Sequence, residues 1–213
     1  QLVEQAKESE MVLAIGSGSI CDLGKYVAFK LGLTYAIFAT SPSMDGYLST
    51  GAALMNKEFK TTYETKSPEI MLIDTKILAE SPQVMIAAGI GDILGKYTAL
   101  TDWQLASILL DEPINQEAFS LMEAALKKLT KNYELIIKRN TRGIAILIDA
   151  LNIAGIAMAI AGNSRPASGS EHHTSHYLEM NFIKNKLLNP LHGLKVGLGT
   201  LISLSLYHNF DLL

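Results

Sequence analysis

Continuous apolar runs, separated by polar turns, mark the first third of the chain. Residues 11–15 and 35–39 form two such runs, and residues 70–73 form a third. Short apolar runs bounded by turns are typical of strands buried on both faces of a parallel sheet. Between the first two runs, residues 22–31 carry apolar side chains at helical spacing. The order strand, glycine turn, helix, strand predicts an α/β region with a parallel sheet.

After about residue 80 the pattern changes to long amphipathic segments without strand-like alternation. The helices that this pattern predicts cover residues 83–88, 92–109, 116–129 and 141–161, a segment at His172, and residues 193–207. Asp92 would then lie at a helix start. We therefore predict an α/β nucleotide-binding domain at residues 1–80 and an all-α domain at residues 81–213.

The most apolar stretch of the chain, residues 143–162, contains Asp149, Asn152 and Gly155. A transmembrane helix needs about 20 predominantly apolar residues, and the polar residues inside this stretch favour a buried core helix instead. We therefore expect no membrane span. The first ten residues are polar and charged, unlike a signal peptide. Because the chain opens without methionine and within a helical pattern, we expect residues to precede Gln1.

Composition narrows the range of partners. The chain is 48% hydrophobic and 18% charged, its net charge is −3, and it has no basic cluster that could follow a phosphate backbone. We therefore do not expect nucleic acid as a partner. The single cysteine, Cys21, excludes an internal disulfide framework and fits a reducing compartment, the cytoplasm.

A glycine turn joins the first predicted strand to the helix that follows it. Glycines let the backbone approach a phosphate group, and the N–H groups at a helix start attract an anion. The turn lacks the full G-x-G-x-x-G spacing because residue 21 is cysteine. An ordinary strand-to-helix turn explains it equally well. Its residues are Gly16, Ser17, Gly18, Ser19 and Ile20.

A polar loop follows the second predicted strand. Loops at the carboxyl ends of parallel strands are where such folds bind ligands. Asp45 offers a carboxylate to a ligand hydroxyl group, while the serines and threonine offer hydroxyls. A simple turn uses the same residue types for backbone reasons, and composition alone favours that interpretation. The loop's candidate residues are Thr40, Ser41, Pro42, Ser43, Asp45 and, just beyond, Ser49.

Four of the five histidines fall within 21 residues of an otherwise apolar region. A carboxylate with two imidazoles leaves an open position on zinc or a similar divalent ion, as catalysis requires. Asp92 and two of the histidines, which are His172, His173, His176 and His192, could supply such a set. His176 lies four residues after His172 and so shares its helical face; either both bind metal, or one binds metal while the other faces substrate.

Two cations lie close to these residues along the chain. Lys96 follows Asp92 by one helical turn, and Arg165 precedes the predicted His172 helix. Each is a candidate ligand for a substrate phosphate. From the sequence alone, a solvated charge is the commoner explanation for each.

Taken together and in this order, these motifs resemble the iron-type alcohol dehydrogenase and dehydroquinate synthase superfamily, and within it the glycerol-1-phosphate dehydrogenases. The likeness covers nearly all of residues 11–213. The resemblance implies an N-terminal nucleotide domain, a C-terminal helical metal-binding domain of the dehydroquinate synthase-like fold, and an active site in the cleft between them. Its most specific marks are Ser43-Met44-Asp45-Gly46, Gly91-Asp92 with Lys96-Tyr97-Thr98, residues 164–172 (SRPASGSEH), and Leu191-His192-Gly193.

The resemblance also implies roles for these residues. The metal would bind to Asp92, His172 and His192, and the substrate would meet Asp45, His176 and also Asp92. The dinucleotide, NAD or NADP, would be held by the glycine turn, the loop after the second strand, and Ser49. The family normally has a further strand-helix unit before the glycine turn. Without it, the preference between NAD and NADP stays open.

The activity that the resemblance implies is the reduction of dihydroxyacetone phosphate to sn-glycerol 1-phosphate, with zinc or nickel as the metal. We also expect a homo-oligomer. One alternative is a glycerol dehydrogenase acting on an unphosphorylated polyol. A lyase of the dehydroquinate synthase type is less favoured because of Lys96 and the SRPASGSEH stretch. A non-catalytic ligand-binding relic would be expected to lose metal ligands, and here the set is intact.

Overall fold

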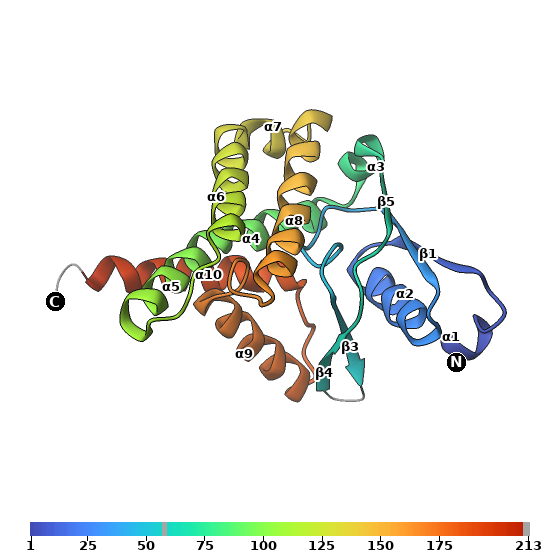
Figure 1. Cartoon of the computed structure of the whole chain (residues 1–213). Helices are drawn as coiled ribbons and strands as arrows, with labels where there is room; N and C mark the ends of the chain where they lie inside the picture. Colours follow the sequence, from blue (N-terminus) through green and yellow to red (C-terminus); the bar gives the residue numbers. More distant parts are fainter. Residues whose placement is uncertain (57–58, 211–213) are drawn as a thin grey trace.

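The structure, a computed structural model, describes residues 1–56 and 59–210 (Figure 1). Its three predicted strands are present as β1 (Met11–Gly16), β2 (Thr34–Ala39) and β5 (Ile70–Ile73). They form a parallel sheet in the order β1-β2-β5. The prediction of a parallel sheet built from these three apolar runs is confirmed.

One antiparallel hairpin was not anticipated from the sequence. It consists of β3 (Gly51–Asn56) and β4 (Phe59–Glu64), and β3 lies against α2 (Gly18–Leu31). Its first strand contains a short apolar run at residues 52–55 that was not interpreted as a strand, and its second strand has no such run.

The prediction of a strand buried on both faces is wrong for β1 within this chain, and β5 is also exposed. Only β2 is largely buried, whereas Ile15 is 61% exposed and Leu13 and Leu72 are also exposed. Helix α2 packs against β1 and β2 and buries Ala14 and Ile37 on one face. An apolar run alone therefore did not distinguish a strand covered on one face from a strand covered on both.

All described residues after β5 that belong to regular structure are helical. The helices beyond α1 (Leu2–Gln5) and α2 are α3 (Thr75–Glu80), α4 (Gln83–Leu94), α5 (Lys96–Leu110), α6 (Gln116–Lys131), α7 (Tyr133–Ile137), α8 (Thr141–Ala161), α9 (Ser170–Lys184) and α10 (His192–Phe210). The domain boundary at residue 80 stays a prediction.

The predicted helix start at Asp92 is wrong. Helix α4 runs through Gly89 and Gly91, and Asp92 lies in its last turn. A Cβ atom on Gly89 would lie 1.8 Å from the Pro42 carbonyl oxygen, and one on Gly91 would lie 2.3 Å from the Gly193 carbonyl oxygen. Gly89 and Gly91 are therefore places where other backbone segments touch the helix.

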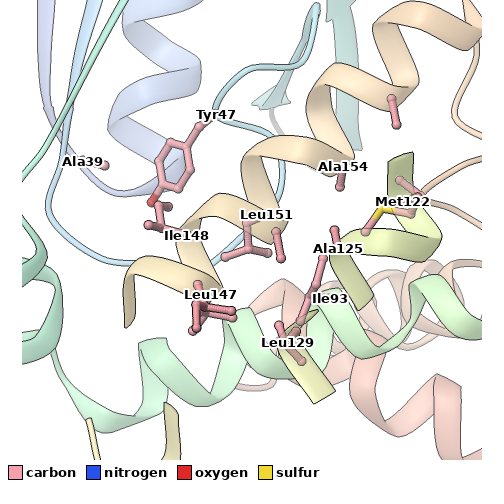
Figure 2. Close-up of a cluster of buried hydrophobic side chains, with 14 of the residues drawn as sticks. Ala39, Tyr47, Ile93, Met122, Ala125, Leu129, Leu147, Ile148, Leu151 and Ala154 are labelled. Carbon is pink, nitrogen blue, oxygen red and sulfur yellow. The ribbon is translucent and has the colours of Figure 1, made fainter. Parts of the chain in front are cut away.

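Helix α8 occupies the centre of the helical region, in contact with α3, α4, α6 and α7 (Figure 1). Leu147, Ile148 and Leu151 belong to its buried cluster, which Tyr47 of the β2–β3 loop joins (Figure 2). Among the described residues, α8 is the one helix long and apolar enough to cross a membrane by length and composition, and half of that window is buried within the fold.

The loop between β2 and β3 is anchored to this core. The Tyr47 hydroxyl donates to the Ser41 carbonyl oxygen at 2.7 Å. On α8, a Cβ atom at Gly155 would lie 3.2 Å from the Asp45 carbonyl oxygen, so the loop backbone rests directly on that helix. The core thus fixes the position of the loop that carries Asp45.

Candidate metal centre and active site

Three of the predicted site residues meet where α4, α9 and α10 come together. Asp92, His172 and His192 each offer one ligand atom, and these atoms lie within 4.8 Å of one another. The His172 Nε2 to Asp92 Oδ1 distance is 3.9 Å, and the ring centroids of His172 and His192 are 5.2 Å apart. Asp92 and His172 are buried and His192 is half-buried. One carboxylate with two imidazoles is a donor set that suits zinc or a similar divalent ion and leaves an open position.

The approach of α10 to α4 explains how His192 reaches the other two residues. His192 is the first residue of α10, and Gly193 follows it. A Cβ atom on Gly193 would lie 1.9 Å from the Ala88 carbonyl oxygen. Only a residue without a side chain permits this contact, which places His192 beside Asp92.

Lys96 lies between two carboxylates. Its Nζ atom is 2.6 Å from Asp45 Oδ2 and 2.8 Å from Asp92 Oδ1, and its side chain is fully buried. Gly95 separates α4 from α5 but keeps helical backbone angles, so Lys96 remains one turn after Asp92. The Asp45 N–H also donates to Asp92 Oδ2 at 3.0 Å. The predicted substrate carboxylate is thus tied to the predicted metal carboxylate.

The charges of this cluster follow from these contacts. Burial raises the pKa of Asp92, but Lys96, His192 and His172 outweigh it and lower that pKa to about 2. Burial and the neighbouring Asp92 raise the pKa of Asp45, although Lys96 opposes them. Burial lowers the pKa of Lys96, but Asp45 and Asp92 more than offset it and hold that pKa above its usual range. Asp92 is therefore ionised and Lys96 protonated, and Asp45 is the more basic carboxylate.

His176 lies at the open side of the cluster. Its ring centroid is 6.4 Å from that of His172 and 6.2 Å from that of His192, and the residue is exposed. This position follows from its place one turn beyond His172 on α9. The role of His176 toward substrate stays a prediction.

The two segments predicted to hold the dinucleotide lie side by side at the carboxyl ends of β1 and β2. The Thr40 N–H donates to the Gly16 carbonyl oxygen at 3.1 Å. A Cβ atom on Gly18 would lie 3.1 Å from Met44 Cε. Ser17 precedes the first turn of α2, and no side-chain hydrogen bond caps that helix. The turn therefore presents helix N–H groups beside the loop.

The loop serines are largely engaged within the protein. Ser41 and Ser43 are buried, and the Ser41 hydroxyl donates to the Ser43 hydroxyl at 3.1 Å. The Ser49 hydroxyl lies within hydrogen-bond distance of the Gly46 and Gly51 carbonyl oxygens. Ser19 and Ile20 of the glycine turn are exposed. Cofactor roles for all these residues stay predictions.

Neither predicted phosphate ligand is displayed as an isolated cation. Lys96 is paired with Asp45 and Asp92, as described above. Arg165 donates from Nε to Glu112 Oε1 at 2.7 Å and from Nη2 to Glu112 Oε2. These pairings argue against a phosphate role in the geometry shown, and the role stays a prediction.

Two further residues that the sequence did not single out shape the site. Lys25 of α2 is buried and donates to the carbonyl oxygens of Gly46, Ser49 and Gly51 at 2.8, 2.9 and 3.0 Å. Nothing in the sequence distinguishes it from a surface lysine. Glu171 lies 2.7 Å from His172 Nδ1 through Oε1. Adjacent residues on a helix ordinarily point apart, so this contact could not be predicted.

The Glu171 carboxyl is held in its ionised form. Burial raises the pKa of Glu171, but His172, Thr98 and the backbone of Gly169 lower it more, so that the pKa lies below its usual range. A carboxylate can only accept hydrogen bonds.

Comparisons with known proteins show which proteins this chain is similar to. The family described as iron-containing alcohol dehydrogenase matches residues 1–82. A protein of Halalkalibacterium halodurans named glycerol-1-phosphate dehydrogenase, NAD(P)+, is 41% identical over 208 residues, which are 98% of this chain and 52% of that protein. A protein of the same name from Bacillus velezensis is 41% identical over 196 residues, 92% of this chain and 50% of that protein. The chain spans about half the length of the curated relatives it matches.

Solved structures agree on the fold. A probable glycerol dehydrogenase from Sinorhizobium meliloti superposes with a TM-score of 0.77 over 94% of this chain and 58% of that chain, at 20% identity. The predicted fold class, a parallel-sheet α/β region followed by a helical region, is confirmed by this likeness.

Proposed function

We propose that this chain reduces dihydroxyacetone phosphate to sn-glycerol 1-phosphate with NADH or NADPH, because residues 1–82 match the iron-containing alcohol dehydrogenase family and the chain is 41% identical to two glycerol-1-phosphate dehydrogenases. The observation that carries the proposal is the meeting of Asp92, His172 and His192 beside Asp45. The metal is zinc or nickel, and the enzyme is a cytoplasmic homo-oligomer. Residues 1–80 form the nucleotide domain and residues 81–213 the metal and substrate domain.

The residues divide the chemistry among them. Asp92, His172 and His192 would hold a divalent ion, which would supply Lewis-acid polarisation of the substrate oxygen. The glycine turn from Gly16 to Ile20 and the loop from Thr40 to Ser43 would hold the dinucleotide, which would supply the hydride for the reduction.

One proton must reach the substrate oxygen for each hydride that reaches carbon. His176, exposed at the open side of the cluster, exchanges this proton with solvent. Asp45 orients the substrate by accepting a hydrogen bond from a substrate hydroxyl. Its raised pKa supports this role, because a more basic carboxylate accepts hydrogen bonds more strongly.

The experiment follows NADH and NADPH oxidation with dihydroxyacetone phosphate and with dihydroxyacetone, using protein loaded with zinc or nickel. We expect turnover with a clear preference for the phosphorylated ketone. Equal rates on both ketones would instead support a glycerol dehydrogenase, which the pairing of Lys96 and Arg165 with carboxylates favours as the second candidate. Absence of net NADH oxidation would leave a lyase or a non-catalytic protein.

Measuring bound zinc shows whether an absence of NADH oxidation arises because the protein is a lyase or non-catalytic, or because it binds no metal. Alanine at Asp92, His172 or His192 should each remove most bound zinc, because a three-ligand site has no spare donor. Alanine at His176 or Asp45 should lower turnover and leave the zinc stoichiometry unchanged. Unchanged zinc in all three ligand variants would show that the metal lies elsewhere.

A further inference from the structure

Glu171 is a buried carboxylate in the first turn of α9, directly before His172. Its two oxygen atoms take part in three hydrogen bonds. Oε1 accepts from the Gly169 N–H at 2.7 Å and lies 2.7 Å from His172 Nδ1, while Oε2 accepts from the Thr98 hydroxyl at 2.5 Å. Each oxygen is therefore fixed in place, and the carboxylate cannot rotate without breaking a bond.

The space around Glu171 is formed by glycines on three segments. A Cβ atom at Gly95 would lie 3.0 Å from Glu171 Cγ, and one at Gly169 would lie 3.0 Å from its Oε2. A Cβ atom at Gly199 of α10 would lie 2.4 Å from the Glu171 carbonyl oxygen. The backbone of these segments thus encloses both the side chain and the main chain of this residue.

The hydrogen-bond inventory determines the protonation of the neighbouring ring. Glu171 Oε1 already accepts the Gly169 N–H, so it also acts as the acceptor in its contact with His172, and Nδ1 carries the proton there. In the neutral ring the other nitrogen then holds the lone pair. That nitrogen, Nε2, is the one directed toward Asp92 Oδ1.

We propose that Glu171 is a positioning residue that holds His172 as the Nδ1–H tautomer and directs its Nε2 lone pair into the metal centre. This inference rests on the proposed function, which makes His172 a metal ligand. Outer carboxylates that accept a hydrogen bond from a ligating histidine typically strengthen metal binding by about ten- to hundredfold. A carboxylate with a purely structural role would need its hydrogen bonds with Gly169 and Thr98, but not its contact with His172.

The first measurement uses the metal-free parent protein with ¹⁵N-labelled histidine at about pH 8, where histidine is ordinarily neutral. Long-range ¹H–¹⁵N correlations separate a protonated ring nitrogen from one with a lone pair. We expect His172 as the Nδ1–H tautomer. A signal from the Nε2–H tautomer overturns the proposal, and because no metal is present this result is independent of whether the protein binds zinc.

The second measurement compares two substitutions. Glu171→Leu removes both acceptors, so we expect a mixture of His172 tautomers and a zinc dissociation constant raised about ten- to hundredfold, measured by chelator competition. Glu171→Gln keeps an acceptor for Nδ1–H, while its amide group can donate to the Thr98 hydroxyl. We therefore expect it to preserve the tautomer and to weaken zinc binding only a few-fold.

Asp102→Asn is the matched control, because Asp102 Oδ2 also accepts an N–H at the start of α9, from Ser170 at 2.7 Å. It should change thermal stability without altering the His172 tautomer or zinc affinity. Parent-like tautomer and zinc affinity in Glu171→Leu would overturn the proposal. If Glu171→Leu does not fold, the tautomer of the parent and the zinc affinity of Glu171→Gln test the proposal. The proposal is contradicted if His172 of the parent is the Nε2–H tautomer, or if Glu171→Gln weakens zinc binding more than a hundredfold.

Discussion

Two buried lysines show how differently one cation can be used in the same fold. Lys25 directs its ammonium group at three backbone carbonyl oxygens of the β2–β3 loop, whereas Lys96 directs its own at the carboxylates of Asp45 and Asp92. Burial lowers the pKa of Lys25, and more distant carboxylates only partly oppose it. The pKa of Lys96 is instead raised by its two partners.

The comparison distinguishes a lysine that fixes the backbone of a loop from a lysine that compensates the charge of buried carboxylates. The carbonyl oxygens accept the hydrogen bonds of Lys25 but carry no net charge to neutralise its ammonium group. The contribution of Lys25 is therefore to fix the backbone of the loop. Lys96 offsets two negative charges that would otherwise repel each other in a buried place. The resemblance to the family suggested that Lys96 binds a substrate phosphate, but in the structure its ammonium group is already paired with Asp45 and Asp92.

The largest expected effect is that of Lys96→Met in the metal-free protein. Removing one partner of a buried ion pair leaves uncompensated charge and costs about 3–5 kcal/mol of unfolding free energy. Urea denaturation in the presence of a chelator measures this loss. Added zinc should stabilise the variant more than the parent, because the ion replaces the missing positive charge. Equal stabilisation by zinc in both proteins would contradict the proposed charge balance.

Lys25→Met should have the second largest effect. Three buried carbonyl oxygens lose a shared donor, and we expect a loss of about 2 kcal/mol of unfolding free energy. Zinc should not restore it, since no carboxylate is exposed by the change. Lys127→Met, at an exposed i,i+4 pair with Glu123, is the control and should stay within about 0.5 kcal/mol of the parent. A zinc-dependent recovery of Lys25→Met would erase the distinction between the two lysines.

The pH dependence of stability provides a smaller but sharper contrast. The pKa of Asp92 is lowered from an ordinary 3.8 to about 2, so its stabilisation is fully present above about pH 4 and is lost as the pH falls toward 2. Lys96→Met should move this loss to higher pH, because burial then raises the Asp92 pKa with less opposition. Lys25→Met should leave it in place. Chelator-treated protein titrated between about pH 2 and 6 gives the comparison.

The smallest effect is expected at Cys21, which lies one turn before Lys25 on α2. Burial and Asp22 raise the pKa of Cys21 to about 12, although Lys25 lowers it. The thiol should therefore not react with a disulfide reagent at about pH 8 while the chain is folded, and should react after unfolding in urea. Rapid labelling of the native protein would mean that the Lys25 charge activates the thiol.

The sequence was most informative where one short segment carries the whole signal. The apolar runs at residues 11–15, 35–39 and 70–73 predicted strands correctly, and the histidine spacing correctly brought His172 and His176 to one helix face. It was least informative about contacts between distant segments. The Lys96–Asp45 pair joins α5 to the β2–β3 loop, and no local pattern encodes that approach.

Glycine was the residue most easily misinterpreted. The gap between the predicted helices at residues 83–88 and 92–109 contains Gly89 and Gly91, and glycine has low helix propensity. In the folded chain their lack of a side chain admits Pro42 and Gly193, and that close packing outweighs the local cost. The exposure of one face of β1 could not be predicted either, since an apolar run does not reveal how many faces of a strand are covered.

The contacts of α4 also limit how this protein can be redesigned. At Gly89 and Gly193 the site segments meet backbone against backbone, with less room than one methyl group requires. A library that varies side chains around Asp92, His172 and His192 can alter the chemistry of the site, but it cannot widen the spacing between α4, α10 and the Pro42 loop one residue at a time. Any larger substrate must therefore be accommodated on the side of His176, where exposure leaves room, and the wall behind Asp92 will tolerate the fewest replacements.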